Sequence, residues 1–274
     1  MPEIVKRPDP DRLLGDILED ERSAGKGRLK VFLGMAAGVG KTYAMLEESY
    51  RLFREGRRIV IGYVETHGRS ETGALIRDLP VLPRRQINHA GFIIEDFDLD
   101  KVLELKPEYA VVDELAHTNA EGSLHVKRYQ DVIDLLDAGI NVLTTLNIQH
   151  LESQAAVVEK ITGVRINETL PDSVLDRAHE IELVDIPPEL LAERLKEGKV
   201  YIPEQARLAA DNFFRVSNVT ALRELTLKYM AHRVDRDLDE YTGRKDIRGT
   251  WKSGEKILVA VSPSPYSEYL IRWT

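Results

Sequence analysis

The sequence contains no cysteine, and that absence excludes whole classes of site. None of its 274 residues can form a disulfide bond or supply a thiolate to a metal. No apolar run approaches the roughly 18 residues that a membrane span requires, and the acidic N-terminus has no apolar core of signal-peptide length. We therefore expect a soluble, cytoplasmic chain.

A surplus of positive charge is also missing. The chain has 38 Lys and Arg against 46 Asp and Glu, which gives a formal net charge of -8. General nucleic-acid-binding proteins are usually basic, so we expect no nucleic acid partner. The seven histidines show neither HxxxH nor HExxH spacing, which argues against a metal cluster built on histidine.

What the sequence does have is a regular alternation of strand-like and helix-like segments. Short apolar runs suit buried strands, and the amphipathic segments between them suit helices. Such alternation predicts an α/β fold in which helices flank a parallel sheet. The expected strands are residues 29–34, 57–65, 108–114, 140–147, 164–170 and 179–186. The expected helices between them are residues 41–56, 71–79, 98–106, 126–139 and 150–163.

The composition divides the chain into four parts. The main domain continues, from about residue 187, as a helical C-terminal extension, and the last part starts a strand and a helix that cannot bury their own faces. We interpret that last part as the beginning of an incomplete domain. The parts are an N-terminal arm (1–27), the main domain with its extension (28–240, the extension about 187–240), a linker (241–254) and the incomplete domain (255–274). Helices of the extension are expected at 187–198, 203–214 and 217–241, the last with Ser217 as its N-cap.

The segment GMAAGVGKTYAML, residues 34–46, has the features of a phosphate-binding loop. A strand runs into a glycine-rich turn, and a helix begins at Lys-Thr. Backbone N–H groups of such a turn and of the helix N-terminus face phosphate groups. The lysine adds positive charge at the outer phosphates, and the threonine hydroxyl ligates Mg²⁺. The expected nucleotide-binding residues are Gly38, Val39, Gly40, Lys41 and Thr42.

One position departs from the usual pattern. A glycine normally stands five residues before the last glycine of the turn, where this chain has Met35, and Gly34 stands one position earlier. A glycine in such a turn permits a positive φ or a close approach of the backbone, so nucleotide affinity or loop geometry could differ. The alternative is a glycine-rich turn that binds no ligand.

Two acidic residues follow the strand-like run YAVV. A phosphate-binding loop needs an acid at the end of a neighbouring strand to hold the hydration shell of Mg²⁺, and Asp113 suits this role. Glu114 is the candidate catalytic residue, because it can orient an attacking water. The alternative is an ordinary strand end with two solvated carboxylates.

Polar residues also follow other predicted strands, at the edge where ligands of open parallel sheets bind. Arg69 is a candidate arginine finger, from the same chain or a neighbouring one. His117 and Asn147 are further candidate sensor residues. The alternative for each is a helix cap or a hydrogen bond within a loop. The basic segments RRQ (84–86) and KRY (127–129) are expected to be solvated.

Six blocks of this sequence resemble the N-terminal cytoplasmic region of KdpD, a family of bacterial sensor histidine kinases that control expression of a potassium transporter. The resemblance covers roughly residues 8–235. Residues 255–274 are similar to the first strand and loop of the universal-stress-protein-like domain that follows in that family. The blocks are, in order, GMAAGVGKTYAML, GYVETHGRSET, VVDELAHTN, DVIDLLDAGINVLTTLNIQHLES, ELVDIPPELLAERLKEGKVYIPEQA and NFFRVSNVTALREL.

The resemblance implies a P-loop domain that binds ATP with Mg²⁺, through the turn residues and Asp113, and that regulates a distant kinase core. In the family, the membrane helices, the phosphorylated histidine and the kinase core come later, and we find none of them in this sequence. We therefore expect at most slow ATP hydrolysis. The implied partners are the remaining membrane and kinase domains at the cytoplasmic face of the bacterial inner membrane, the response regulator through those domains, and a second copy in a homodimer.

The expected function is thus an ATP-binding regulatory region of a two-component histidine kinase that controls potassium transport. A stand-alone P-loop ATPase or small-molecule kinase is one alternative, supported by Glu114 beside Asp113. An interaction scaffold with a degenerate P-loop is another, supported by Met35. Turnover separates the first two functions, and nucleotide binding tests the third.

Overall fold

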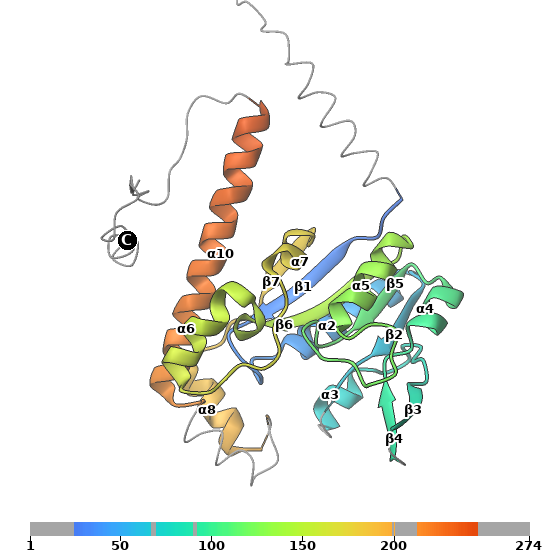
Figure 1. The fold of residues 1–274 in the computed structure, drawn as a ribbon, viewed down its shortest axis with the longest axis horizontal. Helices are drawn as coiled ribbons and strands as arrows, with labels where there is room; N and C mark the ends of the chain where they lie inside the picture. The colour runs from blue at the N-terminus through green and yellow to red at the C-terminus, as the bar shows by residue number, and fades with distance from the viewer. Residues whose placement is uncertain (1–24, 67–69, 90–91, 199, 201–212, 246–274) are drawn as a thin grey trace, which may run out of the picture. The chain divides into compact units, whose positions relative to one another are not determined.

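The structure, a computed structural model, describes residues 25–66, 70–89, 92–198, 200 and 213–245 (Figure 1). The chain forms two compact units, Met1–Thr226 and Leu227–Thr274. The sheet and the candidate site belong to the first unit. In the second unit, the described residues are the C-terminal part of helix α10 (Val216–Lys245).

A five-stranded parallel sheet forms the centre of the first unit (Figure 1). Its strand order is β2-β5-β6-β1-β7, and every neighbouring pair is parallel. The carboxyl ends of the strands therefore lie along one edge. This architecture confirms the predicted α/β class. The strands are β1 (Leu29–Gly34), β2 (Ile59–Tyr63), β5 (Tyr109–Val112), β6 (Asn141–Asn147) and β7 (Glu180–Leu183).

The path of the chain places helices on both faces of this sheet. The chain runs from β1 across to β2 and then returns through β5 and β6 to β7, on the far side of β1. Because such crossovers are right-handed, the helix after β1 covers one face and the helices of the return path cover the other. Buried faces on both sides explain the near-continuous apolar runs of β1, β2 and β6. The helices are α2 (Lys41–Arg54) on the first face and α4 (Leu99–Leu105), α5 (Arg128–Asp137) and α6 (Glu152–Thr162) on the second.

Two apolar clusters pack around the sheet. One lies beneath α2 and joins helix residues such as Met45 and Leu46 to strand residues such as Phe32 and Ile61. The other joins the glycine-rich turn after β1 to the helices that follow the sheet. Its buried members are Met35, Ala36, Val39, Val158, Leu191, Leu195, Val200, Phe214, Val219 and Leu222. The turn is therefore packed against the C-terminal extension.

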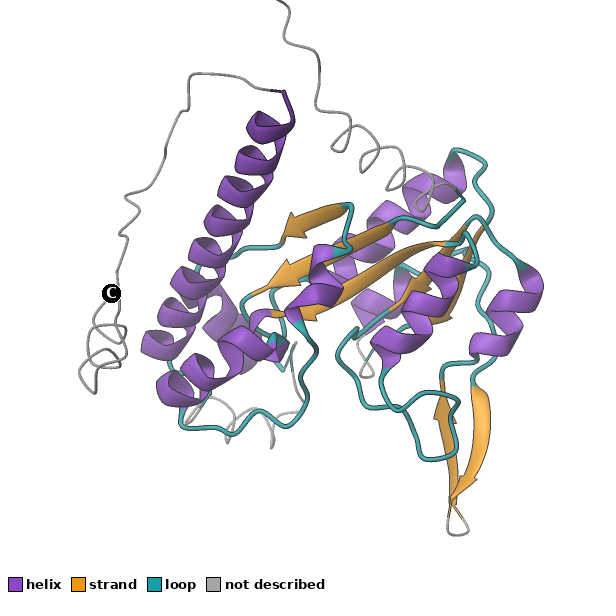
Figure 2. Ribbon diagram, turned by 45° about the horizontal axis from the view of Figure 1, so that its top comes forward, coloured by secondary structure: helices purple, strands orange, loops and turns teal. Residues whose placement is uncertain are grey.

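A β-hairpin that the sequence analysis does not predict projects from the first unit (Figure 2). Strands β3 (Arg85–His89) and β4 (Phe92–Asp96) pair antiparallel. Phe92 and Ile93 in β4 are 76% and 67% exposed. The hairpin thus lacks the alternation of buried apolar and exposed polar residues that identifies a half-buried strand in a sequence.

The remaining elements are short and connect the parts already described. No described helix has both the length and the apolar composition that crossing a membrane would require. The elements are α3 (Ser70–Ala74), the 3₁₀ turn η1 (Ile148–His150), α7 (Asp172–Asp176) and α8 (Pro188–Lys196).

Two predicted features of secondary structure were wrong. The segment 164–170 is not a strand, and only Leu170 pairs, through a single bridge to Leu151. Its apolar alternation resembles a strand, but the chain passes here from α6 to α7 without joining the sheet, whose next strand is β7. Ser217 is not an N-cap, because α10 begins at Val216 and includes it.

Other predictions fall partly or wholly beyond what the structure describes. The helix α10 extends to Lys245, through the first residues of the expected linker. The incomplete domain at 255–274 and most of the N-terminal arm lie outside the described residues, as does most of the helix expected at 203–214.

Candidate functional site

The glycine-rich turn joins β1 to α2 and takes its shape from two glycines. Gly38 and Gly40 have φ angles of 87° and 107°, in the left-handed region that favours glycine. Gly40 is also the N-cap of α2, and neither a capping side chain nor an acidic residue of the first turn supplies negative charge there. The N-terminus of α2 thus keeps the partial positive charge that favours an anion.

Lys41 and Thr42 begin α2 and lie at this turn. The Lys41 side chain is buried, and its Nζ donates a hydrogen bond of 2.9 Å to the carbonyl of Ala36. The Thr42 hydroxyl donates a hydrogen bond of 3.1 Å to Oδ2 of Asp113. The structure therefore brings together the lysine, the threonine and the acid that the sequence analysis singles out.

The packing of the turn accounts for methionine at position 35. A Cβ atom on Gly34 would come within 2.7 Å of Val39 Cγ2 and 3.1 Å of Lys41 Cδ, so the turn closes too tightly there for a side chain. Met35 is 1% exposed and packs in the cluster shared with α8 and α10. The turn thus needs its glycine one position before the usual one, and Met35 anchors the turn to the core.

Asp113 follows β5 and is buried. The expectation that its strand is the neighbour of β1 was wrong, because β6 lies between them. The carboxylate nevertheless reaches the turn. Its Oδ1 accepts hydrogen bonds from the Thr145 hydroxyl and from the Glu114 N–H (3.1 Å), and its Oδ2 accepts from Thr42 and from the Glu65 N–H (3.4 Å). These four donors fix the direction in which the carboxylate points.

Glu114 has an unusual backbone and an unusual acidity. Its φ of 59° lies in the left-handed region, which is rare for a residue with a side chain. Burial, followed by the negative charge of Asp113, raises the pKa of Glu114 to about 7. Near neutral pH the carboxyl is therefore present in both forms and is able to accept or release a proton. A strained backbone of this kind is typical of functional sites.

Arg128 belongs to the KRY segment, and the expectation that this arginine is solvated was wrong. Its side chain is fully buried. The guanidinium donates hydrogen bonds to the Asp96 carboxylate and, at 3.3 Å, to the Asp113 carbonyl, and its Cζ lies 3.8 Å from the centre of the Tyr63 ring. Arg128 thereby fixes the end of β5 that carries Asp113. The sequence held no local signal of this role, because the partners are distant in the chain.

The candidate sensor residues have different surroundings. Asn147 ends β6 directly opposite Gly34, and its buried side-chain oxygen has no hydrogen-bond partner in the structure. His117 stacks on Tyr63, its Nδ1 is 4.0 Å from Oε2 of Glu114, and burial lowers its pKa. Arg69 lies outside the described residues. Buried polar atoms normally have partners, so the Asn147 side chain can still bind a ligand.

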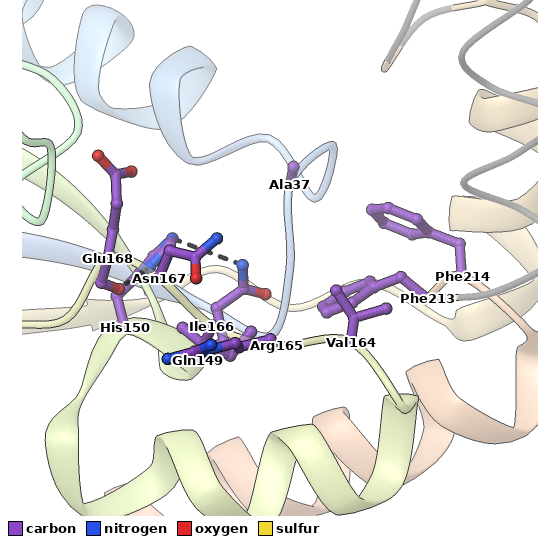
Figure 3. Close-up of a pocket in the computed structure, with 10 residues that line it drawn as sticks. All are labelled: Ala37, Gln149, His150, Val164, Arg165, Ile166, Asn167, Glu168, Phe213 and Phe214. Carbon is purple, nitrogen blue, oxygen red and sulfur yellow. Dashed lines mark hydrogen bonds between the residues drawn. The ribbon is translucent and has the colours of Figure 1, made fainter.

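A pocket of about 470 Å³ lies beside the turn (Figure 3). Figure 3 shows Ala37 of the turn at the pocket, with the rings of Phe213 and Phe214 on one side and with His150 and Glu168 on the other. The two rings are tilted against each other, with their centroids 5.0 Å apart. The pocket therefore combines an apolar wall with a polar one.

The polar wall of the pocket includes His150 and Glu168. His150 follows β6, the strand between β1 and β5. Burial, together with the positive charge of Lys41, lowers the pKa of His150, and its Nδ1 donates a hydrogen bond of 2.7 Å to the Glu168 carbonyl. The Glu168 carboxylate also raises the pKa of Glu114. His117 lies between this wall and the acidic residues, with its Nδ1 3.8 Å from Oε1 of Glu168 and 4.0 Å from Oε2 of Glu114.

The oxygen ligands at the turn fit a magnesium ion that arrives with phosphate. Within the described part of the chain, no group of three or more His, Asp or Glu could hold a metal. Mg²⁺ usually keeps several waters and takes one or two protein ligands together with substrate phosphates. The Thr42 hydroxyl and the Asp113 carboxylate, 3.1 Å apart, supply that number.

Comparison with known proteins gives consistent relatives. Residues 25–234 match the model of KdpD, the osmosensitive K⁺ channel His kinase sensor domain. The chain is 48% identical over 266 residues to the sensor protein KdpD of Escherichia coli (strain K12), covering 97% of this chain and 29% of that protein. The chain is 45% identical over 267 residues to the sensor protein KdpD of Clostridium acetobutylicum, covering 97% of this chain and 30% of that protein. The putative sensor protein KdpD of Synechocystis sp. is 45% identical over 249 residues, which cover 90% of this chain and 66% of that protein.

Proposed function

Because the chain belongs to the KdpD family of sensor domains, we propose that it binds Mg-ATP at the glycine-rich turn and reports the nucleotide state to kinase domains of a longer sensor protein. One observation carries this proposal. The hydrogen bond of 3.1 Å between Thr42 and Asp113 joins the first turn of α2 to the end of β5, beside the Lys41 side chain. A hydroxyl, a carboxylate and an ammonium group at a helix N-terminus are the groups that Mg-nucleotide requires.

The residues of the site have distinct roles in this proposal. The N–H groups from Gly38 to Thr42 and the Lys41 ammonium hold the phosphates. The Thr42 hydroxyl and the Asp113 carboxylate hold the metal, directly or through its water. Bound Mg²⁺ neutralises negative charge on the phosphates. Asn147 ends β6 opposite Gly34, and its side-chain NH₂ group donates a hydrogen bond to the outermost phosphate.

The proposed output is a conformational change rather than fast turnover, because sensing needs only different contacts in two states. The turn contributes Met35 and Val39 to the same cluster as residues of α8 and α10. Any rearrangement of the turn therefore changes the packing of the C-terminal extension. The proposed receivers are the remaining membrane and kinase domains, with the response regulator acting through them, at the cytoplasmic face of the bacterial inner membrane.

Calorimetric titration with ATP, with and without Mg²⁺, tests this proposal. We expect Lys41→Ala to abolish measurable binding of Mg-ATP, because the mutation removes the only mobile positive charge that the loop pattern supplies to the phosphates. Lys26→Ala, which removes an exposed lysine paired with Asp137, is the matched control. Circular dichroism checks that both variants fold. Unchanged affinity in Lys41→Ala would contradict the proposal.

The pocket beside the turn and the raised pKa of Glu114 favour a second function, in which the chain is an ATPase or a kinase of a small molecule. Glu114 would then act as the base, and the pocket of about 470 Å³ would hold the acceptor. Turnover decides between the two functions. A rate well above the ~10⁻⁴ to 10⁻² s⁻¹ of switch-type GTPases would favour the enzyme. A chain that binds no nucleotide would instead be the interaction scaffold.

A further inference from the structure

Helix α8 and Val200 lie directly against the glycine-rich turn. A Cβ atom on Gly38 would come within 2.4 Å of Val200 Cγ2 and 3.0 Å of Leu191 Cδ1. Nη1 of Arg194 donates a hydrogen bond of 3.1 Å to the Gly38 carbonyl, across 156 positions of sequence. The absence of a side chain on Gly38 therefore lets the C-terminal extension touch the backbone of the turn.

The hydrogen bond from Arg194 fixes the direction of one peptide group. The peptide between Gly38 and Val39 is planar and trans, so its C=O and its N–H point in opposite directions. Because Arg194 holds the Gly38 carbonyl toward α8, the Val39 N–H points away from α8. This N–H is one of those that the proposed function assigns to the phosphates.

We infer that Arg194 is a positioning residue of the nucleotide site and that it couples α8 to nucleotide binding. The inference rests on the proposed function. Arg194 holds the Val39 N–H in the orientation that receives phosphate, so binding does not have to order that peptide. The coupling is reciprocal. Phosphate that fixes this peptide also presents the Gly38 carbonyl to Arg194, and it thereby favours the docking of α8 on the turn.

The contact continues from α8 to the start of α10. Arg223 of α10 forms a two-pronged ion pair with Asp185, in the segment between β7 and α8, with Nε to Oδ1 at 2.8 Å and Nη2 to Oδ2 at 2.6 Å. Residues of both helices and of the turn also share one apolar cluster. The members from the helices are Leu191, Leu195, Val219 and Leu222. A change in the docking of α8 therefore reaches the first turns of α10.

Substitution of Arg194 tests this inference in the 274-residue chain. Arg194→Met keeps much of the side-chain length and removes the guanidinium. Lys196→Met removes a positive charge from an exposed position of the same helix and is the matched control. We expect Arg194→Met to weaken Mg-ATP binding about tenfold, as for loss of one hydrogen bond to a charged group, and Lys196→Met to leave it unchanged. Arg194→Lys should restore part of the affinity.

Hydrogen exchange supplies a measurement that a merely structural arginine would not change. In the wild type, Mg-ATP should slow exchange of the amide hydrogens of residues 189–196, because nucleotide favours docking of α8. In Arg194→Met, exchange in α8 should be faster and should no longer respond to Mg-ATP. If Arg194→Met does not fold, the Arg194→Lys affinity and the wild-type exchange decide the question.

The outcomes separate this inference from the proposed function. Equal Mg-ATP affinity in Arg194→Met and Lys196→Met would overturn the inference and leave nucleotide binding intact. If hydrogen exchange in wild-type α8 does not change on addition of Mg-ATP, the inference is also overturned and nucleotide binding stays intact. A wild-type chain that binds no Mg-ATP would overturn the proposed function and the inference together.

Discussion

At the scale of single residues, local spacing predicts the turn well and predicts its supports poorly. Gly38, Gly40, Lys41 and Thr42 could be found from the sequence because their roles depend on neighbours within a few positions. Arg128 could not, because its partners come from β4 and β5 and a basic triplet looks the same whether it is solvated or buried. Arg194 was missed for the same reason.

The raised pKa of Glu114 predicts that its contribution to stability depends on pH. From about pH 4.5 to about pH 7 the unfolded chain ionises at this position while the folded chain keeps its proton. The folded state is therefore progressively destabilised as the pH rises through this window. Glu114→Gln cannot ionise, so its free energy of unfolding should exceed that of the wild type at pH 8 by on the order of 1 kcal/mol, after allowance for the partial exposure of the side chain.

Urea unfolding of the wild type and Glu114→Gln at the two ends of the pH window measures this difference. The two chains should have similar stability well below pH 4.5, where folded and unfolded states are both largely protonated, and should diverge as the pH rises from about 4.5 to about 7. A difference that stays constant with pH would show that Glu114 titrates normally.

Gly38 carries a second prediction at this scale. Gly38→Ala places a Cβ atom 2.4 Å from Val200 Cγ2 at a φ of 87°, so we expect a loss of roughly 2 kcal/mol or more in the free energy of unfolding. Gly73→Ala is the control, because nothing lies within 4 Å of its Cβ position. The control should change stability by less than about 1 kcal/mol. Equal effects of the two substitutions in thermal unfolding would contradict the close approach of Val200.

At the scale of elements, the sequence predicts the strands that are buried on both faces and misses the strands that are exposed. The strands β1, β5 and β6 appear as apolar runs because helices cover both sides of the sheet. The β3–β4 hairpin was missed because its apolar residues are exposed, and residues 164–170 were mistaken for a strand because alternation alone does not show whether a segment pairs with a sheet. Strand order depends on the whole path, so the place of β6 between β1 and β5 was not predicted.

Arg128 gives a prediction about how these elements are joined. Arg128→Met leaves the Asp96 carboxylate buried without its cation, so we expect a loss of roughly 3–5 kcal/mol in the free energy of unfolding. Arg128→Met with Asp96→Asn removes both charges and should recover much of that loss. Urea unfolding of the two single variants and the double variant forms a cycle that isolates the pair. Additive single effects would show that the pair does not join α5 to β4.

At the scale of the whole molecule, the sequence predicts the class of fold and the family, and the structure adds the connection between turn and extension. The family model covers residues 25–234, which includes the turn, β5 and the first part of α10. The shared cluster could not be predicted, because Met35 and Val219 meet only after the chain has crossed the sheet twice. The chain spans less than a third of the Escherichia coli relative, so its signal is proposed to act on domains beyond this region.

The most direct test of the account is a crystal structure of the chain with Mg²⁺ and an ATP analogue that resists hydrolysis. We predict electron density for the phosphates against the N–H groups of Gly38 to Thr42, with the metal bound to the Thr42 hydroxyl and a metal-bound water on Asp113. Phosphates bound elsewhere, such as in the pocket beside Phe213, would contradict the account.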